Sequence, residues 1–275
     1  MTILDRILET KRKEVAEAKR RRPLADLRAE IERIAPPRDF YAAVTTKSPS
    51  GMRLIAEIKK ASPSAGVIVS DFDPVAIART YAAHGASALS VLTDQTYFQG
   101  RLEYIDEVKR AVPLPVLRKD FIIDEYQLYE SRAAGADAVL LIVAALSGAQ
   151  IAELLPIVHS LRMSVLVEVH ADDELKTVLD IVGPPGPDTY LLGINNRDLH
   201  AQKTDLATTT RLAAMLPEGT PFVSESGIAT REDVLRVQQA GACAILVGES
   251  LLKAGDIGGH VDLLLGLTSR KFPAR

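Results

Sequence analysis

The feature that most constrains this chain is a repeated alternation between short apolar runs and amphipathic stretches. Short apolar runs bounded by turn residues are typical of buried strands, whereas apolar residues three and four apart indicate helices. The expected strands are residues 53–59, 88–94, 115–121, 138–144, 164–170, 190–196, 221–226 and 244–248. Because strands that alternate with helices pair in parallel, we expect an α/β fold built around one parallel sheet.

Helices are expected between these strands, and three of them end in a similar phrase. The helical ranges are 74–84, 102–111, 124–134, 149–160, 171–182, 205–216 and 230–240, with a last helix near 257–268. The phrases HGASA, AGADA and AGACA place glycine where a helix can end in the left-handed conformation. Eight βα units predict a closed (β/α)8 TIM barrel. An open doubly wound sheet usually has fewer strands and a G-x-G-x-x-G turn, which follows none of the expected strands.

The first part of the chain lies outside this repeat. Residues 2–34 carry apolar side chains at helical spacing, and Pro36-Pro37 ends the pattern. We therefore expect one barrel domain over residues 1–275, of which residues 1–50 form a helical N-terminal extension.

The charge balance excludes several classes of protein. A net charge of −3 and an aromatic share of 5% do not fit a general nucleic-acid binder. The basic run Lys19–Arg22 is interpreted as the solvated end of a helix, where cations oppose the helix dipole. No apolar run reaches the ~20 residues of a membrane-spanning helix, and the N-terminus lacks an apolar signal core. We expect neither nucleic acid nor membrane among the partners.

Cysteine and histidine are too few and too scattered for a disulfide framework or a metal site. The single cysteine, Cys243, lies in an apolar stretch and is expected to be a buried, inert thiol. The five histidines show no H-x-x-x-H spacing, so no bound metal is expected. This cysteine usage suits a reducing compartment, and we expect a cytoplasmic enzyme, either a monomer or a weak homodimer.

Charged residues follow several expected strands at positions two apart. Because residues i and i+2 share a face of a strand, one parity selects four pairs for the barrel interior. They are Glu57 with Lys59, Lys119 with Phe121, Glu168 with His170, and Asn195 with Arg197. Ionised groups beside core residues need partners or a purpose, and barrel active sites lie at these carboxyl ends. Salt bridges to the surrounding helices account for one or two such charges, but poorly for the whole set.

The other parity gives the neighbours of these groups a different role. Arg118 and Asp120 are expected to point outward, toward the helices. His170 shares the inward parity of Glu168, and we interpret it as a structural hydrogen-bonding residue rather than a catalytic one.

Glycine and hydroxyl residues gather at the last two strand ends. In many barrels the loops after strands 7 and 8 bind phosphate through backbone N–H groups. The residues concerned are Ser224, Ser226, Gly227, Gly248, Glu249 and Ser250, and Ser62 and Ser64 after the first strand adjoin them in a closed barrel.

Seven motifs in order carry a resemblance to a known family. They are AEIKKASPSAG, VLTDQTYFQG, LRKDFIID, VLVEVH, GINNRDL, VSESGI and LVGESLL. From about residue 2 to 268 the chain resembles the indole-3-glycerol-phosphate synthase family of tryptophan biosynthesis. The resemblance implies the substrate 1-(2-carboxyphenylamino)-1-deoxyribulose 5-phosphate, ring closure with loss of CO₂ and water, and no cofactor.

The resemblance also implies roles for particular residues. Lys119 is the expected general acid and Glu168 the general base, while Lys59 pairs with a carboxylate and is a second candidate proton donor; which lysine performs each transfer stays open. Glu57, Asn195 and Glu225 are expected to position substrate hydroxyls and hold the lysines. Arg197 is expected to face the substrate carboxylate. The expected ring contacts are Phe98, Phe121, Leu146 and Leu199, and the expected phosphate contacts are Ser62, Ser226, Gly227, Gly248 and Glu249.

Two departures and two alternatives accompany this interpretation. Glu249 stands where some family members have a small residue, and HAQKTD after GINNRDL is more polar than the family pattern. One alternative is another phosphate-handling barrel, such as phosphoribosylanthranilate isomerase or a flavin enzyme, against which the two inward lysines and Glu168 argue. The other is a catalytically silent barrel that serves as a scaffold.

Overall fold

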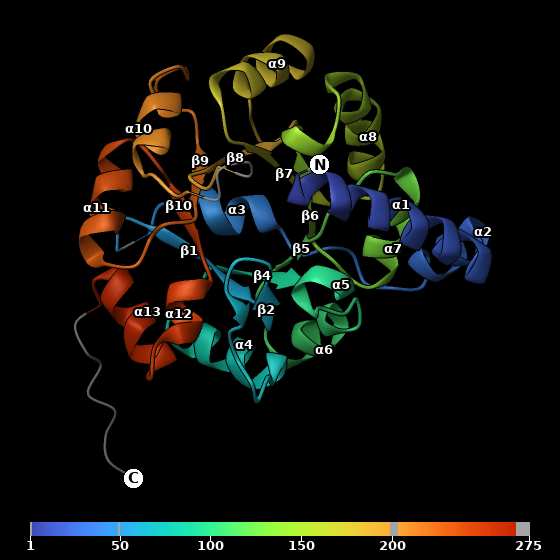
Figure 1. The fold of residues 1–275 in the computed structure, drawn as a ribbon, viewed down its shortest axis with the longest axis horizontal. Coiled ribbons are helices and arrows are strands. Elements are labelled where there is room, and N and C mark those ends of the chain that lie inside the picture. The colour runs from blue at the N-terminus through green and yellow to red at the C-terminus, as the bar shows by residue number, and fades with distance from the viewer. Residues whose placement is uncertain (1, 49, 199–202, 268–275) are drawn as a thin grey trace.

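Eight parallel strands close into a barrel in this computed structural model, which describes residues 2–48, 50–198 and 203–267 (Figure 1). The first strand pairs with the last, from Arg53 opposite Ala244 to Ala56 opposite Val247, and this pairing closes the sheet. In chain order the barrel strands are β1 (Arg53–Ile58), β4 (Ala88–Leu92), β5 (Val116–Lys119), β6 (Ala138–Ile142), β7 (Ser164–Val169), β8 (Leu191–Asn195), β9 (Phe222–Glu225) and β10 (Ala244–Val247). The predicted TIM barrel is confirmed.

Helices form an outer ring around these strands (Figure 1). They are α4 (Pro74–Ala83), α6 (Tyr104–Ala111), α7 (Glu125–Ala133), α8 (Gly148–Ser160), α9 (Asp172–Val182), α10 (Ala207–Ala213), α11 (Arg231–Gln239) and α13 (Ile257–Leu265). Side chains at the residue before the helix fix several starting points: Asp73, Ser147 and Thr230 each accept hydrogen bonds from first-turn N–H groups. The last residue of the predicted helix 257–268 lies outside the described residues.

Several short elements were not predicted from the sequence. They are α3 (Phe40–Thr45), α5 (Gln95–Phe98), α12 (Glu249–Lys253), the 3₁₀ turn η1 (Val143–Ala145) and the two-stranded hairpin of β2 (Ala61–Ser62) and β3 (Gly66–Val67). Each is too short to show a periodic apolar pattern, so sequence periodicity cannot reveal it.

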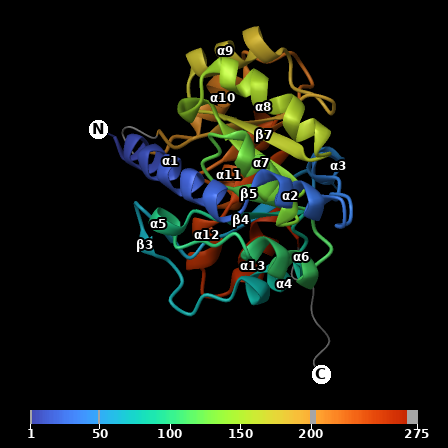
Figure 2. The same ribbon diagram turned by 90° about the vertical axis from the view of Figure 1, so that its right-hand side faces the viewer.

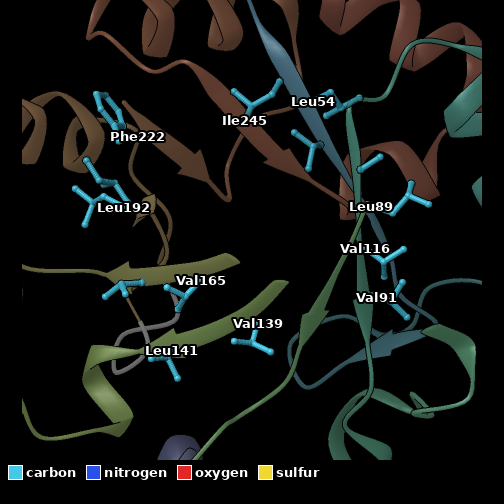
Figure 3. Packing of buried hydrophobic residues seen from close by; sticks show 14 of the residues in the cluster. Leu54, Leu89, Val91, Val116, Val139, Leu141, Val165, Leu192, Phe222 and Ile245 are labelled. Atoms are coloured by element: carbon cyan, nitrogen blue, oxygen red, sulfur yellow. The ribbon is translucent and has the colours of Figure 1, made fainter. Parts of the chain in front are cut away.

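The barrel has two apolar layers, one on each side of the sheet. Outward-facing side chains such as Leu54, Val139 and Ile245 pack toward the helices (Figure 3). Inward-facing side chains such as Ile55 and Leu117 fill the barrel interior together with Phe40 and Val44 of α3, and all four are buried. The alternation of the two layers follows from the two-residue period of a strand.

The N-terminal extension places one helix at each end of the barrel. Figure 2 shows α1 (Ile3–Arg21) and α3 on opposite sides of the strands. Val15 of α1 and Leu27 of α2 (Leu24–Ile31) pack against Tyr126 of α7. Basic residues Lys19 to Arg21 occupy the last turn of α1, as predicted. No helix in the described part of the chain is long and apolar enough to cross a membrane.

Candidate active site

One cavity of about 480 Å³ opens at the carboxyl ends of the barrel strands. Its wall includes residues that follow β1, β4, β5, β8, β9 and β10, as well as side chains of β6, β7 and α1. Of the sequence-predicted site residues, the cavity brings together Glu57, Lys59, Ser62, Phe98, Lys119, Phe121, Glu168, Asn195, Arg197, Glu225, Ser226, Gly227, Gly248 and Glu249.

Lys119 lines this cavity and lies between two buried carboxylates. Its Nζ donates to Glu168 Oε2 at 2.5 Å and to Glu225 Oε2 at 2.8 Å, so three strands, β5, β7 and β9, meet at one ammonium group. Burial alone would lower the pKa of Lys119, but Glu168, Glu225 and Glu57 raise it above its usual range. The lysine is therefore a protonated group at neutral pH with acceptors in place.

The pKa values of the two carboxyl groups that bind Lys119 are shifted in opposite directions. Burial and the neighbouring Glu168 carboxylate raise the pKa of Glu225 to about 8 despite the Lys119 ammonium. Burial acts in the same direction on Glu168, but Lys119 and His170 hold the pKa of Glu168 well below its usual range. The cluster thus contains an ionised carboxylate, Glu168, beside a neutral one, Glu225, over much of the physiological pH range.

Two glycines make room for the carboxylates. A Cβ on Gly193 of β8 would lie 2.3 Å from Glu225 Oε1. A Cβ on Gly248 would lie 2.6 Å from Glu57 Oε1, and that oxygen accepts a hydrogen bond from Lys59 Nζ at 2.6 Å. Only glycine at these two strand ends leaves the carboxylates where they are, because real Cβ contacts are not this short.

The ends of β8, β9 and β10 form a polar rim on the cavity. Arg197 donates to Ser64 Oγ at 3.0 Å and to Glu249 Oε2 at 3.3 Å, so it connects the loop after β1 with α12. Its backbone N–H donates to Asn195 Oδ1 at 3.0 Å. Ser226 and Gly227 have φ of 66° and 78°, a left-handed pair that turns the chain sharply after β9. A non-glycine residue held in this conformation often marks a functional site.

The opposite wall of the cavity is apolar. The rings of Phe98 and Phe121 lie with their centroids 6.2 Å apart, and Leu140 and Ile142 of β6 face the same space. The prediction for Leu146 is wrong, since this residue lies in the outer apolar layer and does not line the cavity. The chain leaves β6 at Ile142 and enters η1, which re-aims the residues that follow.

The sequence analysis missed part of the apolar wall. Leu140 and Ile142 follow the inward parity of their strand and could have been found by it. Ile3, Leu4 and Ile7 of α1 also line the cavity, and no local signal shows that their helix lies over the barrel mouth. The predicted ring contact Leu199 lies outside the described residues.

A second ionic cluster lies on the outer side of the same strand ends. Arg118 donates to Asp120 Oδ2 at 3.0 Å and to Glu130 Oε2 of α7 at 2.8 Å, which confirms the predicted outward orientation of Arg118. Asp120 belongs to the same cluster but also borders the cavity. Lys11 of α1 completes the cluster, with Nζ at 2.9 Å from both Asp94 Oδ2 and Asp120 Oδ1. All of these groups except Glu130 are buried.

Fold and cavity together define the class of this protein. A closed parallel barrel with lysine and carboxylate side chains converging at its carboxyl ends is an enzyme of the (β/α)8-barrel type. The family model for indole-3-glycerol phosphate synthase matches residues 4–264. The chain belongs to the indole-3-glycerol phosphate synthase family.

Curated relatives agree with this family. Indole-3-glycerol phosphate synthase from Roseiflexus sp. is 52% identical over 273 residues, which cover 96% of this chain and 98% of the relative. The enzyme of that name from Acidithiobacillus ferrooxidans is 50% identical over 263 residues, which cover 95% and 98% of the two chains.

Solved structures at lower identity share the fold. A 3-hexulose-6-phosphate synthase matches with a TM-score of 0.60 and 18% identity, over 79% of this chain and 100% of that chain. A tryptophan synthase α-subunit from Pyrococcus furiosus matches with a TM-score of 0.56 and 15% identity, over 78% and 98% of the two chains.

Proposed function

We propose that this protein closes the indole ring of indole-3-glycerol phosphate from 1-(2-carboxyphenylamino)-1-deoxyribulose 5-phosphate. The observation that carries the proposal is Lys119, a half-buried ammonium that lines the cavity and is held by Glu168 and Glu225. A ketone that accepts a proton while a weakly nucleophilic ring carbon attacks it requires such a positioned acid.

Ring closure is the first step of the proposed reaction. The ring carbon that bears the carboxylate attacks the ketone carbon, and Lys119 gives its proton to the ketone oxygen, which becomes a hydroxyl group. Carbon dioxide then leaves with the C–C bond broken, and its electron pair restores the aromatic ring. A wall containing Phe98 and Phe121 excludes water around the substrate ring. The charged carboxylate is then poorly solvated, which favours its departure as CO₂.

Dehydration is the second step. The hydroxyl group leaves as water with a proton from Lys59, and Glu168 removes a proton from the carbon next to nitrogen to form the second double bond of the new ring. Lys59 lies 2.6 Å from Glu57, which holds its ammonium in place. Glu168 suits the role of base because its lowered pKa keeps it ionised at neutral pH. We assign Asn195, Glu57 and Glu225 to positioning of the substrate hydroxyls and the lysines.

The substrate phosphate is assigned to the polar rim. Ser62, Ser226, Gly227, Gly248 and Glu249 line this end of the cavity, and Gly248, the N-cap of α12, provides no side-chain cap. Backbone N–H groups left without partners at such a turn are suited to a phosphate. Arg197 lines the same cavity and bonds to Ser64 and Glu249 of the rim, and we assign its guanidinium to the substrate carboxylate.

Product formation tests the proposal directly. We expect purified protein to produce indole fluorescence from the anilino-deoxyribulose phosphate, with one CO₂ released for each indole formed. Glu168→Gln is expected to lower kcat by about 10²–10⁴-fold, because it removes a general base while keeping the side-chain shape. Glu153→Gln on the exposed face of α8 is the matched control and should retain full activity. Absence of product with the unaltered chain would overturn the proposal.

A further inference from the structure

A histidine lies behind the proposed general base. His170 follows β7 and does not line the cavity, yet its Nε2 lies 3.2 Å from Glu168 Oε1. The other oxygen of the same carboxylate, Oε2, accepts the hydrogen bond from Lys119. Each oxygen of Glu168 therefore faces the nitrogen of a different basic side chain.

The start of α9 fixes this histidine. Glu174 in the first turn accepts a hydrogen bond from the backbone N–H of His170 at 2.6 Å, and its Oε2 lies 3.2 Å from His170 Nδ1. Ala171 at the N-cap provides no side-chain cap, so Glu174 reaches back past it to the histidine. Because Nδ1 faces a carboxylate, that ring nitrogen carries a proton.

The contacts of both ring nitrogens indicate the charge of the His170 imidazole. With a proton on Nδ1, a neutral imidazole would leave the buried, unprotonated Nε2, which makes no hydrogen bond to a described residue, 3.2 Å from the ionised Glu168 Oε1. Two facing acceptors in a buried place repel each other unless a proton lies between them. A doubly protonated His170 removes the repulsion. Burial alone would lower the pKa of His170, but its contacts with Glu168 and Glu174 raise it to about 10.

We propose that His170 is a positioning residue that keeps Glu168 ionised after Lys119 has given its proton to the substrate. The inference rests on the proposed roles of Lys119 and Glu168. Once Lys119 becomes a neutral amine, Glu168 loses one of its two cations while it remains buried beside Glu225. The imidazolium is the cation that stays. Without it, Glu168 would take up a proton itself and could not act as the base of the second step.

The charged groups around Glu168 and His170 come from four elements of the fold. Lys119 of β5 and Glu225 of β9 border Glu168, and Glu174 of α9 borders His170. Asp172, also of α9, is paired with Arg211 of α10 and so does not leave an unbalanced charge nearby. Glu168 is therefore balanced by two cations, of which only Lys119 lines the cavity where the reaction takes place.

The pH dependence of kcat/KM tests the proposal. In His170→Gln and His170→Met the acid limb of the profile is expected to move upward by about one pH unit, because Glu168 loses a permanent counter-charge. Activity on the acid side of the profile should then fall about tenfold relative to the unaltered enzyme. Asp173→Asn, which removes an exposed carboxylate of the same helix turn, should leave both limbs unchanged.

The controls separate this proposal from the proposed function. Folded His170 variants with the acid limb of the unaltered enzyme would overturn the role of His170. A fully active Glu168→Gln would instead overturn the role of Glu168 in the reaction. If neither His170 variant folds, the same acid limb is measured in His170→Asn, and an unmoved acid limb in that folded variant would also overturn the proposal.

Discussion

Two ionic clusters lie at the carboxyl end of β5, one on the inner side of the barrel and one on the outer side. Both consist of basic and carboxylate side chains, but their surroundings differ. Lys119 on the inner side meets Glu168 and Glu225 and lines the cavity. Asp120 on the outer side meets Arg118 and Lys11 beneath α1 and α7. Adjacent residues of one strand thus supply groups to both clusters, because successive side chains point to opposite faces.

The two clusters differ in where their carboxyl group of raised pKa lies. On the outer side, Arg118 and Lys11 outweigh burial and hold the pKa of Asp120 well below its usual range, whereas burial raises the pKa of Asp94, which does not line the cavity. On the inner side, Glu225 Oε1 is buried and makes no hydrogen bond to any described residue, and the pKa of Glu225 is raised to about 8. A carboxyl group of raised pKa beside a cavity is placed to exchange protons with a ligand, whereas one that is buried away from the cavity is not.

Breaking the outer cluster should have a large effect on stability. Lys11→Met leaves Asp94 and Asp120 without one of their cations, and we expect the free energy of unfolding to fall by about 3–5 kcal/mol in urea titrations. Lys13→Met in the same helix removes an exposed ion pair with Glu9 and should change it by less than about 1 kcal/mol. Equal effects of the two substitutions would contradict the assigned difference between buried and exposed pairs.

The raised pKa of Glu225 in the inner cluster should make the free energy of unfolding depend on pH. The folded-state pKa of Glu225, about 8, lies above the ordinary glutamate value of 4.5, so the folded state binds this proton more tightly than the unfolded state. Its contribution to stability is present below pH 4.5 and is lost as the pH rises toward 8. Glu225→Gln keeps a neutral side chain, and we expect its unfolding free energy to decline less over this range. Parallel pH curves for the two proteins would exclude a raised pKa.

The glycine beside Glu225 provides a steric test of the inner cluster. Gly193→Ala places a Cβ 2.3 Å from Glu225 Oε1, and we expect it to displace that carboxylate, reduce kcat and lower the unfolding free energy by about 1–3 kcal/mol. Gly186→Ala is the matched control, since its Cβ would meet no atom closer than 3.6 Å. Steady-state kinetics of both variants would show whether the position of Glu225 matters.

Removing one hydrogen bond on the helix side of β1 should have the smallest effect on the free energy of unfolding. The buried hydroxyl of Tyr81 on α4 donates to the carbonyl oxygen of Glu57 at 3.1 Å. Tyr81→Phe removes this bond on the helix side of β1, and we expect the unfolding free energy to fall by about 1 kcal/mol with kcat unchanged. A large fall in kcat would mean that the helix side also positions Glu57.

Much of the fold and of the polar site could be predicted because both depend on local periods. The two-residue period of strands placed Glu57, Lys119 and Glu168 on the inner face and Arg118 on the outer one. The motif resemblance added expected roles, which remain predictions. Leu146 was misplaced because the turn η1 interrupts the strand period after Ile142.

Features that depend on tertiary docking could not be predicted. Lys11 lies on the same face of α1 as the buried Leu8 and Val15 and its side chain is 5% exposed, but nothing local shows which carboxylates it meets. Its position depends on α1 lying across the ends of β4 and β5, where Lys11 forms ion pairs with Asp94 and Asp120. The apolar contributions of Ile3, Leu4 and Ile7 to the cavity have the same origin.

The most direct test of the division between the two clusters is kcat for the same substitution on each side, Lys119→Met and Lys11→Met, measured by indole fluorescence at a temperature where both variants are folded. We expect Lys119→Met to lose at least about a thousandfold in kcat, because it removes the proposed general acid, and Lys11→Met to stay within a few-fold of the unaltered enzyme. Comparable losses in the two variants, or a Lys119→Met enzyme within a few-fold of normal, would contradict the account.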